Sequence, residues 1–147
     1  MALNQKFGTT QILAEPGRCI AGPCLTIATS IIGKAIRGDK RWYYIDDGVY
    51  HSFSGVIFEN SSPQITPLGK YHSSEDDSLI EPQYPSTIAG PTCDSIDVVN
   101  HSVMLPELEI GDILISSDIG AYSIASGTDF NFVPRAHLVV INKMGQI

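Results

Sequence analysis

The stretch Arg41-Trp42-Tyr43-Tyr44-Ile45-Asp46-Asp47-Gly48 couples an aromatic run to a turn-forming Asp-Asp-Gly. Aromatic and β-branched side chains favour strands, and Asp with Gly favours the turn that ends one. Gly38-Asp39 makes a plausible turn just before this run. The stretch therefore predicts a strand with a turn at each end.

Short runs of the same kind continue toward the C-terminus. They are Val49 to Phe53, Gly55 to Glu59, Glu109 to Ser116, Ala121 to Ala125 and Ala136 to Ile141. Between the second and third of these, Asn60 to Pro85 is polar, and its charged run Ser73 to Asp77 is typical of a solvated surface excursion. Many short strands with few helices predict a mainly β fold, a barrel or a sandwich.

Toward the N-terminus, an apolar run at Gln11 to Ala14 ends in Glu15-Pro16-Gly17-Arg18. Pro and Gly enforce a turn, so this pattern predicts a buried strand that opens into a loop. The periodicity from Leu25 to Ile36 is ambiguous, because Pro23 could begin a helix while the following β-branched residues favour a strand. We favour a short helical turn near Arg18 to Pro23 and then a strand.

Length and charge limit the classes of function. The chain has 147 residues, enough for one domain with a real core but too few for a whole β/α barrel of about 250 residues. Hydrophobic residues make up 43% and charged residues 17%, which indicates a folded protein. The net charge is −7. An acidic chain argues against nucleic acid as a partner and suits cationic small molecules better.

The sequence lacks the patterns of a membrane span, a signal peptide, a disulfide framework and a metal site. Apolar runs are far shorter than the eighteen or so residues that cross a bilayer, and no signal-peptide pattern begins the chain, so we expect a cytoplasmic protein without a membrane partner. Three cysteines without a CxxC pair make a disulfide framework improbable. Four scattered histidines give no metal-ligand spacing, and we expect no metal site.

Four motifs follow one another along the chain. They are Glu15-Pro16-Gly17-Arg18, Asp46-Asp47-Gly48-Val49-Tyr50, Gly90-Pro91-Thr92-Cys93-Asp94-Ser95-Ile96-Asp97 and Gly120-Ala121-Tyr122. Each motif alone is weak. Together they resemble the C-terminal part of the pyridoxal-phosphate-dependent ornithine, lysine, arginine and diaminopimelate decarboxylases, which share an alanine-racemase-like fold. The resemblance runs from about residue 10 to residue 141, and the GPTCDxxD run is similar to the ornithine and lysine branch.

The resemblance implies a domain plan. Residues 25–147 would form a Greek-key-like β-barrel domain, like the C-terminal domain of alanine racemase. Residues 1–24 would be a remnant of the last repeat of a β/α barrel that binds pyridoxal 5'-phosphate. The family holds this cofactor as a Schiff base on a barrel lysine in a Tyr-Ala-Val-Lys-like strand, and no lysine here has that context. We therefore expect cofactor binding only with a barrel supplied in addition, through a homo-oligomer or a barrel-bearing chain.

The resemblance also assigns cofactor contacts. Glu15 would sit against the pyridine nitrogen and keep the ring electron-poor, which makes it a catalytic as well as a cofactor-binding residue. Gly17 and Arg18 would hold the phosphate through a close backbone approach and a fixed cation. Tyr122 would lie near the same phosphate. A strand-turn with a surface arginine is the ordinary alternative for such a motif in isolation.

Substrate and proton-transfer residues follow from the other motifs. Cys93 matches the cysteine that returns a proton to the α-carbon after carbon dioxide leaves, a task suited to a thiol. Asp94 matches the carboxylate that holds the distal ammonium of a diamino acid. Phe58 and Glu59 match an aromatic and an acidic residue at the far end of that pocket.

Two neighbouring features are less clear. Asp97 could be a simple helix or loop cap. Phe130-Asn131 begins the family's FNGF run, but Phe132-Val133 stands where Gly-Phe is expected.

The implied function is a decarboxylase domain of polyamine biosynthesis. It would contribute the cysteine and aspartate loop to an active site at a dimer interface, and the enzyme would convert ornithine to putrescine or lysine to cadaverine. The sequence leaves the choice among ornithine, lysine and arginine open. An inactive, stand-alone binding or regulatory module, or a truncated product of the same family, is the alternative.

Overall fold

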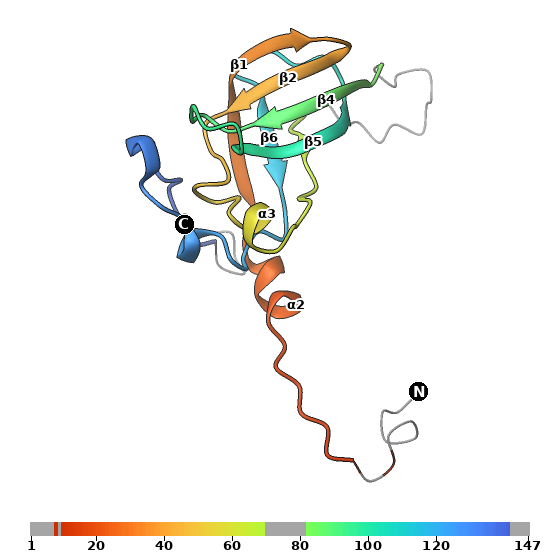
Figure 1. Cartoon of the computed structure of the whole chain (residues 1–147), viewed down its shortest axis with the longest axis vertical. Helices are drawn as coiled ribbons and strands as arrows, with labels where there is room; N and C mark the ends of the chain where they lie inside the picture. Colours follow the sequence, from red (N-terminus) through yellow and green to blue (C-terminus); the bar gives the residue numbers. More distant parts are fainter. Residues whose placement is uncertain (1–7, 9, 70–81, 142–147) are drawn as a thin grey trace.

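The computed structural model describes residues 8, 10–69 and 82–141, and these form a mainly β structure (Figure 1). The elements along the chain are α2 (Arg18–Ala21), η1 (Gly22–Cys24), β1 (Ile27–Arg37), β2 (Lys40–Ile45), α3 (Gly55–Phe58), β3 (Thr66–Pro67), β4 (Tyr84–Ala89), β5 (Val98–Leu105), β6 (Ile113–Ser116), η3 (Ile124–Ser126) and η4 (Phe130–Phe132). Within the described ranges, no helix is long and apolar enough to cross a membrane.

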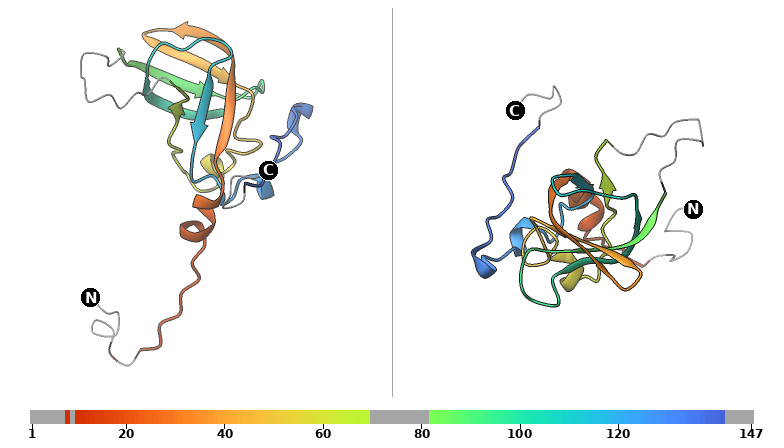
Figure 2. Two further views of the ribbon diagram at one scale, coloured as in Figure 1. Left: turned by 180° about the vertical axis from the view of Figure 1, so that it is seen from behind. Right: turned by 90° about the horizontal axis from the view of Figure 1, so that it is seen from above.

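One sheet of six strands curls strongly into a half-barrel, as Figures 1 and 2 show, in the order β3-β6-β1-β2-β4-β5. The long β1 produces the curl. Its first residues pair with β6, its last residues pair with β2, and the register shifts between Ile31 and Gly33. Such an irregularity bends a strand. Neighbours are antiparallel except for the parallel pair β2 and β4. The prediction of a mainly β, barrel-like domain is confirmed.

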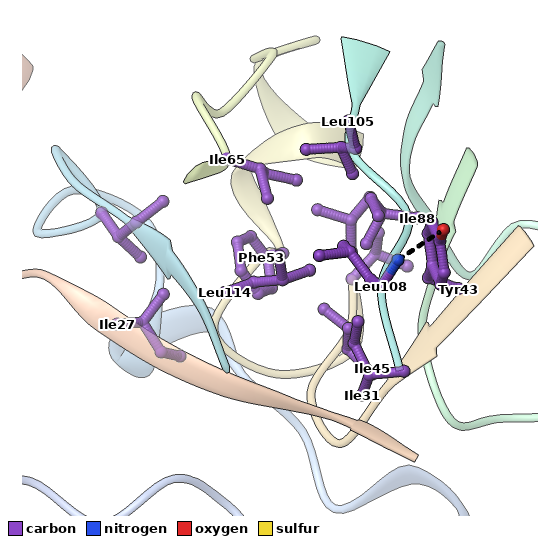
Figure 3. Packing of buried hydrophobic residues seen from close by; sticks show 13 residues of the cluster. Ile27, Ile31, Tyr43, Ile45, Phe53, Ile65, Ile88, Leu105, Leu108 and Leu114 are labelled. Atoms are coloured by element: carbon purple, nitrogen blue, oxygen red, sulfur yellow. Dashed lines mark hydrogen bonds between the residues drawn. The ribbon is translucent and has the colours of Figure 1, made fainter. Parts of the chain in front are cut away.

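The concave side of the curl holds the hydrophobic core (Figure 3). Side chains alternate along β1, so Ile27 and Ile31 point inward while their neighbours are exposed. Each such buried side chain contributes about 1.5–3 kcal/mol. Tyr43 is buried here too, and its hydroxyl accepts a hydrogen bond of 3.1 Å from the Leu108 backbone N–H. Burial raises the pKa of the Tyr43 hydroxyl, so it stays a neutral partner.

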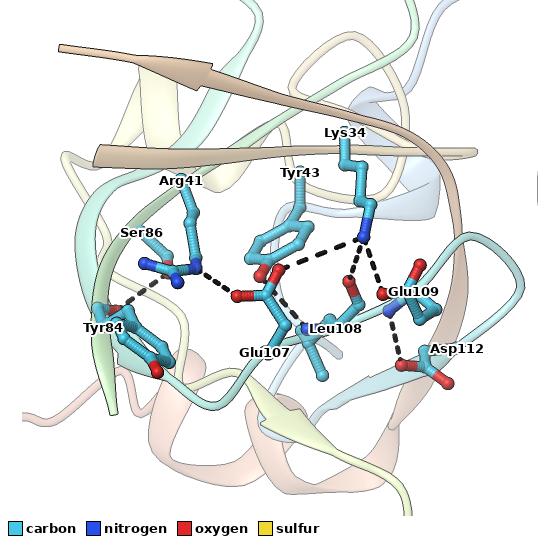
Figure 4. Close-up of polar contacts among 9 residues, drawn as sticks. All are labelled: Lys34, Arg41, Tyr43, Tyr84, Ser86, Glu107, Leu108, Glu109 and Asp112. Carbon is cyan, nitrogen blue, oxygen red and sulfur yellow. Dashed lines mark hydrogen bonds and ion pairs between the residues drawn. The ribbon is translucent and has the colours of Figure 1, made fainter. Parts of the chain in front are cut away.

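The connection from β5 to β6 is held against the sheet by charged side chains (Figure 4). Lys34 on β1 donates to Glu109 at 2.7 Å, and Arg41 on β2 pairs with Glu107 at 2.5 Å. The Arg41 guanidinium also stacks over the Tyr84 ring at 3.3 Å. Exposed ion pairs add little stability. Their effect here is to keep Leu108 over the Tyr43 hydroxyl.

Several expected strands differ in the structure. Val49 to Phe53 is a series of turns and Gly55–Phe58 is the helix α3, because backbone hydrogen bonds such as Val56 N–H to Phe53 carbonyl close locally. Ala121 to Ala125 leads into η3, and Ala136 to Ile141 is exposed and joins no ladder. The strand expected over Glu109 to Ser116 is shorter in the structure, where only Ile113–Ser116 is extended and paired.

Three strands were missed and one segment was misjudged. β3 lies within Asn60 to Pro85, which was expected to be a surface excursion, and Ile65 of the same stretch belongs to the core. β4 and β5 lie where no strand was expected, since Pro85 marks β4 as irregular. Gln11 to Ala14 is extended and exposed, not a buried strand, because no described strand pairs with it. The helical turn near Arg18 to Pro23 and the strand that follows are confirmed. The charged run Ser73 to Asp77 lies outside the described residues, and the boundary at residue 24 stays a prediction.

Candidate active site

Arg18 is the centre of a first cluster of site residues. It begins α2, and its guanidinium pairs with the Glu59 carboxylate just after α3. The same guanidinium donates to the Ala121 carbonyl at 3.4 Å. The side chains of Arg18 and Glu59 remain 40% and 26% exposed, so solvent screens this pair. The contacts thus bring three distant segments together at one end of the sheet, where α2 and α3 lie (Figure 1).

Tyr122 lines the same hollow as Arg18. Its backbone has a left-handed φ of 51°, and its carbonyl accepts a 2.9 Å hydrogen bond from the Ser54 hydroxyl. Gly55 leaves the space between them open. A Cβ there would lie 3.2 Å from both the Arg18 guanidinium and the Ser61 hydroxyl. The hollow therefore places the Arg18 guanidinium and the Tyr122 backbone beside a glycine without a side chain.

Gly120 allows the two segments of this cluster to touch. Its N–H donates to the Gly22 carbonyl at 2.9 Å. A Cβ at this position would lie 1.9 Å from the Ala21 carbonyl oxygen and 2.6 Å from the Cys24 sulfur. Only glycine permits so close an approach of two backbones. The Gly-Ala-Tyr motif is thus fixed directly against α2 and η1.

The thiol loop, residues Gly90–Asp97 between β4 and β5, is anchored by a buried carboxylate. Asp97 is 2% exposed, and its carboxylate accepts hydrogen bonds from the Val49 N–H at 2.9 Å and from the Thr92 N–H and hydroxyl at 3.0 and 2.6 Å. A Cβ at Gly48 or Gly90 would lie 2.3 or 2.1 Å from this carboxylate. Asp97 therefore ties the thiol loop to the turn after β2, which is more than a local cap.

Asp94, on the same loop, is held by Tyr50. The Tyr50 hydroxyl donates to the Asp94 carboxylate at 2.5 Å. This hydrogen bond raises the pKa of Tyr50 to about 12, and it holds the pKa of the Asp94 carboxyl below its usual range. A carboxylate that stays ionised is what a cationic group requires for binding. Asp94 is thereby fixed as an anion at neutral pH.

Residues Thr128–Phe132, which we call the capping segment, pack on Tyr50 and reach Cys93, whose side chain stays exposed. The Thr128 N–H and hydroxyl both donate to the Tyr50 carbonyl, at 2.7 and 3.1 Å. The Phe130 ring stacks on the Tyr50 ring with centroids 4.2 Å apart. The Asn131 amide lies 3.5 Å from the Cys93 sulfur and donates to it. Tyr50 thus lies between the capping segment and the thiol loop.

The expected site residues fall into two clusters. Arg18, Glu59 and Tyr122 form one, and Cys93 with Asp94 forms the other. Among the described residues, no hydrogen bond or ion pair joins Glu59 to Asp94, so their convergence on one ammonium stays a prediction. Glu15 and Gly17 lie on the exposed extended arm before α2 (Figure 1), and Phe58 is exposed.

Other residues hold the clusters without having been identified from the sequence. Asp97 was expected only as a cap, and Tyr50 was quoted in a motif without a role. The pair Gly48 and Gly90, both lying against Asp97, is the sequence signal that could have pointed to it. Within the described ranges, no group of three potential ligands could hold a metal ion.

The curled sheet and its loops define the class of the protein: a mainly β sheet domain that groups Arg18, Glu59 and Tyr122 at one end and carries a thiol loop beside a fixed carboxylate. The family model described as pyridoxal-dependent decarboxylase, C-terminal sheet domain, matches residues 19–120. The chain belongs to this family.

Individual relatives agree with this assignment. The chloroplastic ornithine decarboxylase of Nicotiana glauca is 40% identical over 134 residues, which cover 88% of this chain and 31% of that protein. A lysine/ornithine decarboxylase from Vibrio vulnificus, crystallised with cadaverine, is 41% identical with a TM-score of 0.77, over 90% of this chain and 34% of that one. The crystal structure of lysine decarboxylase from Selenomonas ruminantium is 35% identical with a TM-score of 0.71, over 91% of this chain and 34% of that one. The chain thus spans about a third of the length of these relatives.

Proposed function

We propose that the chain serves as the C-terminal sheet domain of a pyridoxal-phosphate-dependent decarboxylase that acts on ornithine or lysine. The observation that carries this proposal is the thiol loop, where Cys93 adjoins an Asp94 held as an anion by Tyr50. A thiol and a fixed carboxylate side by side suit a substrate with a reacting carbon and a remote ammonium. The names of the relatives agree with this substrate class.

We propose that the first cluster holds the phosphate of the cofactor. The hollow offers the Arg18 guanidinium and Tyr122, with Gly55 leaving room beside them. An anion there would share the guanidinium with Glu59. Gly17 would add a backbone N–H, and Glu15 would face the ring nitrogen. When bound, the cofactor supplies the electron sink that decarboxylation needs.

The second cluster would act on the substrate. Cys93 would give a proton to the α-carbon after carbon dioxide has left. Asp94 would accept charge-assisted hydrogen bonds from the distal ammonium. Phe58 and Glu59 would line the far end of the pocket, and Glu59 would then have to leave its pair with Arg18. Two carboxylates set apart from the α-carbon would select a diamino acid over a neutral one.

Among the described residues, no hydrogen bond or ion pair joins the two clusters, and this supports a composite site. We propose that the thiol loop faces a barrel on a second subunit in a homo-oligomer. Ile96 on the loop and Phe132 on the capping segment are 53% and 94% exposed, and exposed apolar side chains near a polar site are typical of interaction surfaces. The cytoplasmic location expected from the sequence is part of the same proposal.

A chimera tests this function. The matching C-terminal region of the Vibrio vulnificus lysine/ornithine decarboxylase is replaced by this chain, and carbon dioxide and diamine are measured from ornithine and from lysine. We expect both to form. In the chimera, Asp94→Ala should raise KM about thirtyfold or more, Cys93→Ala should lower the diamine formed per carbon dioxide released, and Arg18→Ala should weaken cofactor retention. The exposed hairpin variant Asp39→Asn should change none of these. A chimera that folds and retains cofactor but releases no carbon dioxide would overturn the proposal.

A further inference from the structure

The capping segment contains the most strained backbone near the thiol loop. Asn131 and Phe132 are consecutive residues with left-handed φ values of 55° and 54°. This conformation costs about 1–2 kcal/mol at a residue such as Phe132, whereas asparagine adopts it more readily. Strain of this kind persists only where the surroundings enforce it, and it collects at functional sites.

The surroundings that enforce this strain can be named. Two hydrogen bonds from Thr128 and the ring stack of Phe130 fasten the segment to Tyr50. Tyr50 in turn holds Asp94, the residue next to Cys93. The turn at Asn131 therefore cannot drift relative to the thiol loop. This arrangement places the Asn131 side-chain amide 3.5 Å from the Cys93 sulfur.

In this contact the Asn131 amide is the hydrogen-bond donor and the Cys93 sulfur is the acceptor. The Asn131 side-chain nitrogen carries two N–H groups and no acceptor, so it can only donate to sulfur. A donor favours the thiolate over the thiol, because hydrogen bonding to a charged form stabilises that form. The nearest charged neighbour on the loop, Asp94, has the opposite influence on a thiolate, since it is held as an anion. Asp97, buried behind the loop, adds a second carboxylate, and on the capping segment Asp129 is paired with Arg135 at 2.7 Å.

We infer that Asn131 is a positioning residue for Cys93: its amide orients the sulfur and stabilises the thiolate against the neighbouring carboxylates. Any effect of the Asn131 contact on turnover rests on the proposed role of Cys93 as proton donor. The contact itself does not depend on that role, and it can be tested without any decarboxylation.

The test is the alkylation of Cys93 by iodoacetamide in the full chain. Cys19 and Cys24, both exposed, are first changed to serine so that one thiol remains. The alkylation rate is then measured from pH 6 to pH 10. In Asn131→Ala, the rate at pH 7 should fall about threefold to tenfold, the equivalent of one net hydrogen bond. The limiting rate at high pH should be unchanged, so the half-maximal rate moves to higher pH.

Two further variants separate the amide from the backbone. Asn131→Gly removes the amide but accepts a left-handed φ at no cost, and it should lose as much rate at pH 7 as Asn131→Ala. Asn131→Asp keeps the shape but places a carboxylate beside the sulfur, and it should lose more. Near-ultraviolet circular dichroism of the Tyr50 and Phe130 stack serves as the check on folding.

Two results would overturn the inference. If Asn131→Gly alkylates like the parent, the backbone conformation rather than the amide matters. If the limiting rate changes while the half-maximal pH stays fixed, Asn131 controls access rather than the thiolate. In the chimera described above, Asn131→Gly should lower kcat with KM unchanged. An inactive chimera would count against the proposed function, while the alkylation result would still decide the role of Asn131.

Discussion

Replacing Asp97 by asparagine should destabilise the domain more than its small change in shape implies. The carboxylate accepts three hydrogen bonds, from the Val49 N–H and from the N–H and hydroxyl of Thr92, in a site that is 2% exposed. The asparagine carbonyl can serve Thr92, but its NH₂ group must then face the Val49 N–H without an acceptor. A buried donor left unsatisfied costs about 1–3 kcal/mol, and the remaining bonds lose their charge assistance.

The expected loss is therefore about 2–4 kcal/mol, out of a total stability of about 5–15 kcal/mol. Equilibrium unfolding in urea, followed by the fluorescence of the single tryptophan, measures it. Asp129→Asn is the matched control, since Asp129 pairs with Arg135 at an exposed site, and it should shift the midpoint far less. Hydrogen exchange at Val49 and Thr92 should accelerate in Asp97→Asn alone. A loss below about 0.5 kcal/mol, the range of ordinary surface substitutions, would refute the view that Asp97 anchors the thiol loop.

Three further predictions concern other contacts of the site. The depressed pKa of Asp94 contributes stability that is present above the unfolded pKa of about 4 and is lost as the pH falls through the lower folded pKa. The difference in urea midpoint between the parent and Tyr50→Phe should therefore be largest at pH 7 and should disappear in acid. A difference that does not depend on pH would contradict this. Phe132→Gly relieves a left-handed φ at a side chain that is 94% exposed, so thermal unfolding should show a gain of about 0.5–1 kcal/mol, and a loss would show that the ring makes a needed contact. Gly120→Ala forces a Cβ onto the Ala21 carbonyl and should lower the free energy of unfolding by at least about 2 kcal/mol. Gly17→Ala is the control, because no atom lies within 4 Å of its Cβ, and it should unfold like the parent. Equal stability of the two variants would refute the close approach at Gly120.

The sequence was a good guide where the signal is local. The strands β1 and β2 follow from β-branched and aromatic residues, and the turn between them follows from Gly38 and Asp39. The helical turn at Arg18 follows from proline and glycine spacing. By contrast, β4 is buried between β2 and β5 through pairings that no local pattern reveals, and Pro85 works against its recognition.

The site was predictable only in part, and mainly from the family resemblance. Arg18, Glu59 and Tyr122 belong to segments far apart in sequence, and their grouping depends on how the sheet curls. The link from Tyr50 to Asp94 likewise joins two loops, and no spacing rule predicts such a hydrogen bond. Sequence patterns identify groups that can react, but the residues that hold them are found from packing.

The pairings of β1 also set an order of assembly. Strand β1 forms a hairpin with β2 that is closed by a two-residue turn, and hairpins of this kind form in about 1–10 μs. With β6 it pairs Ile27 to Ser116, across most of the chain, and such non-local contacts are slow because the loop must close before they stabilise it. Gly120 and Tyr122 follow β6 directly. We therefore expect the Arg18 cluster to form only after β1 has paired with β6.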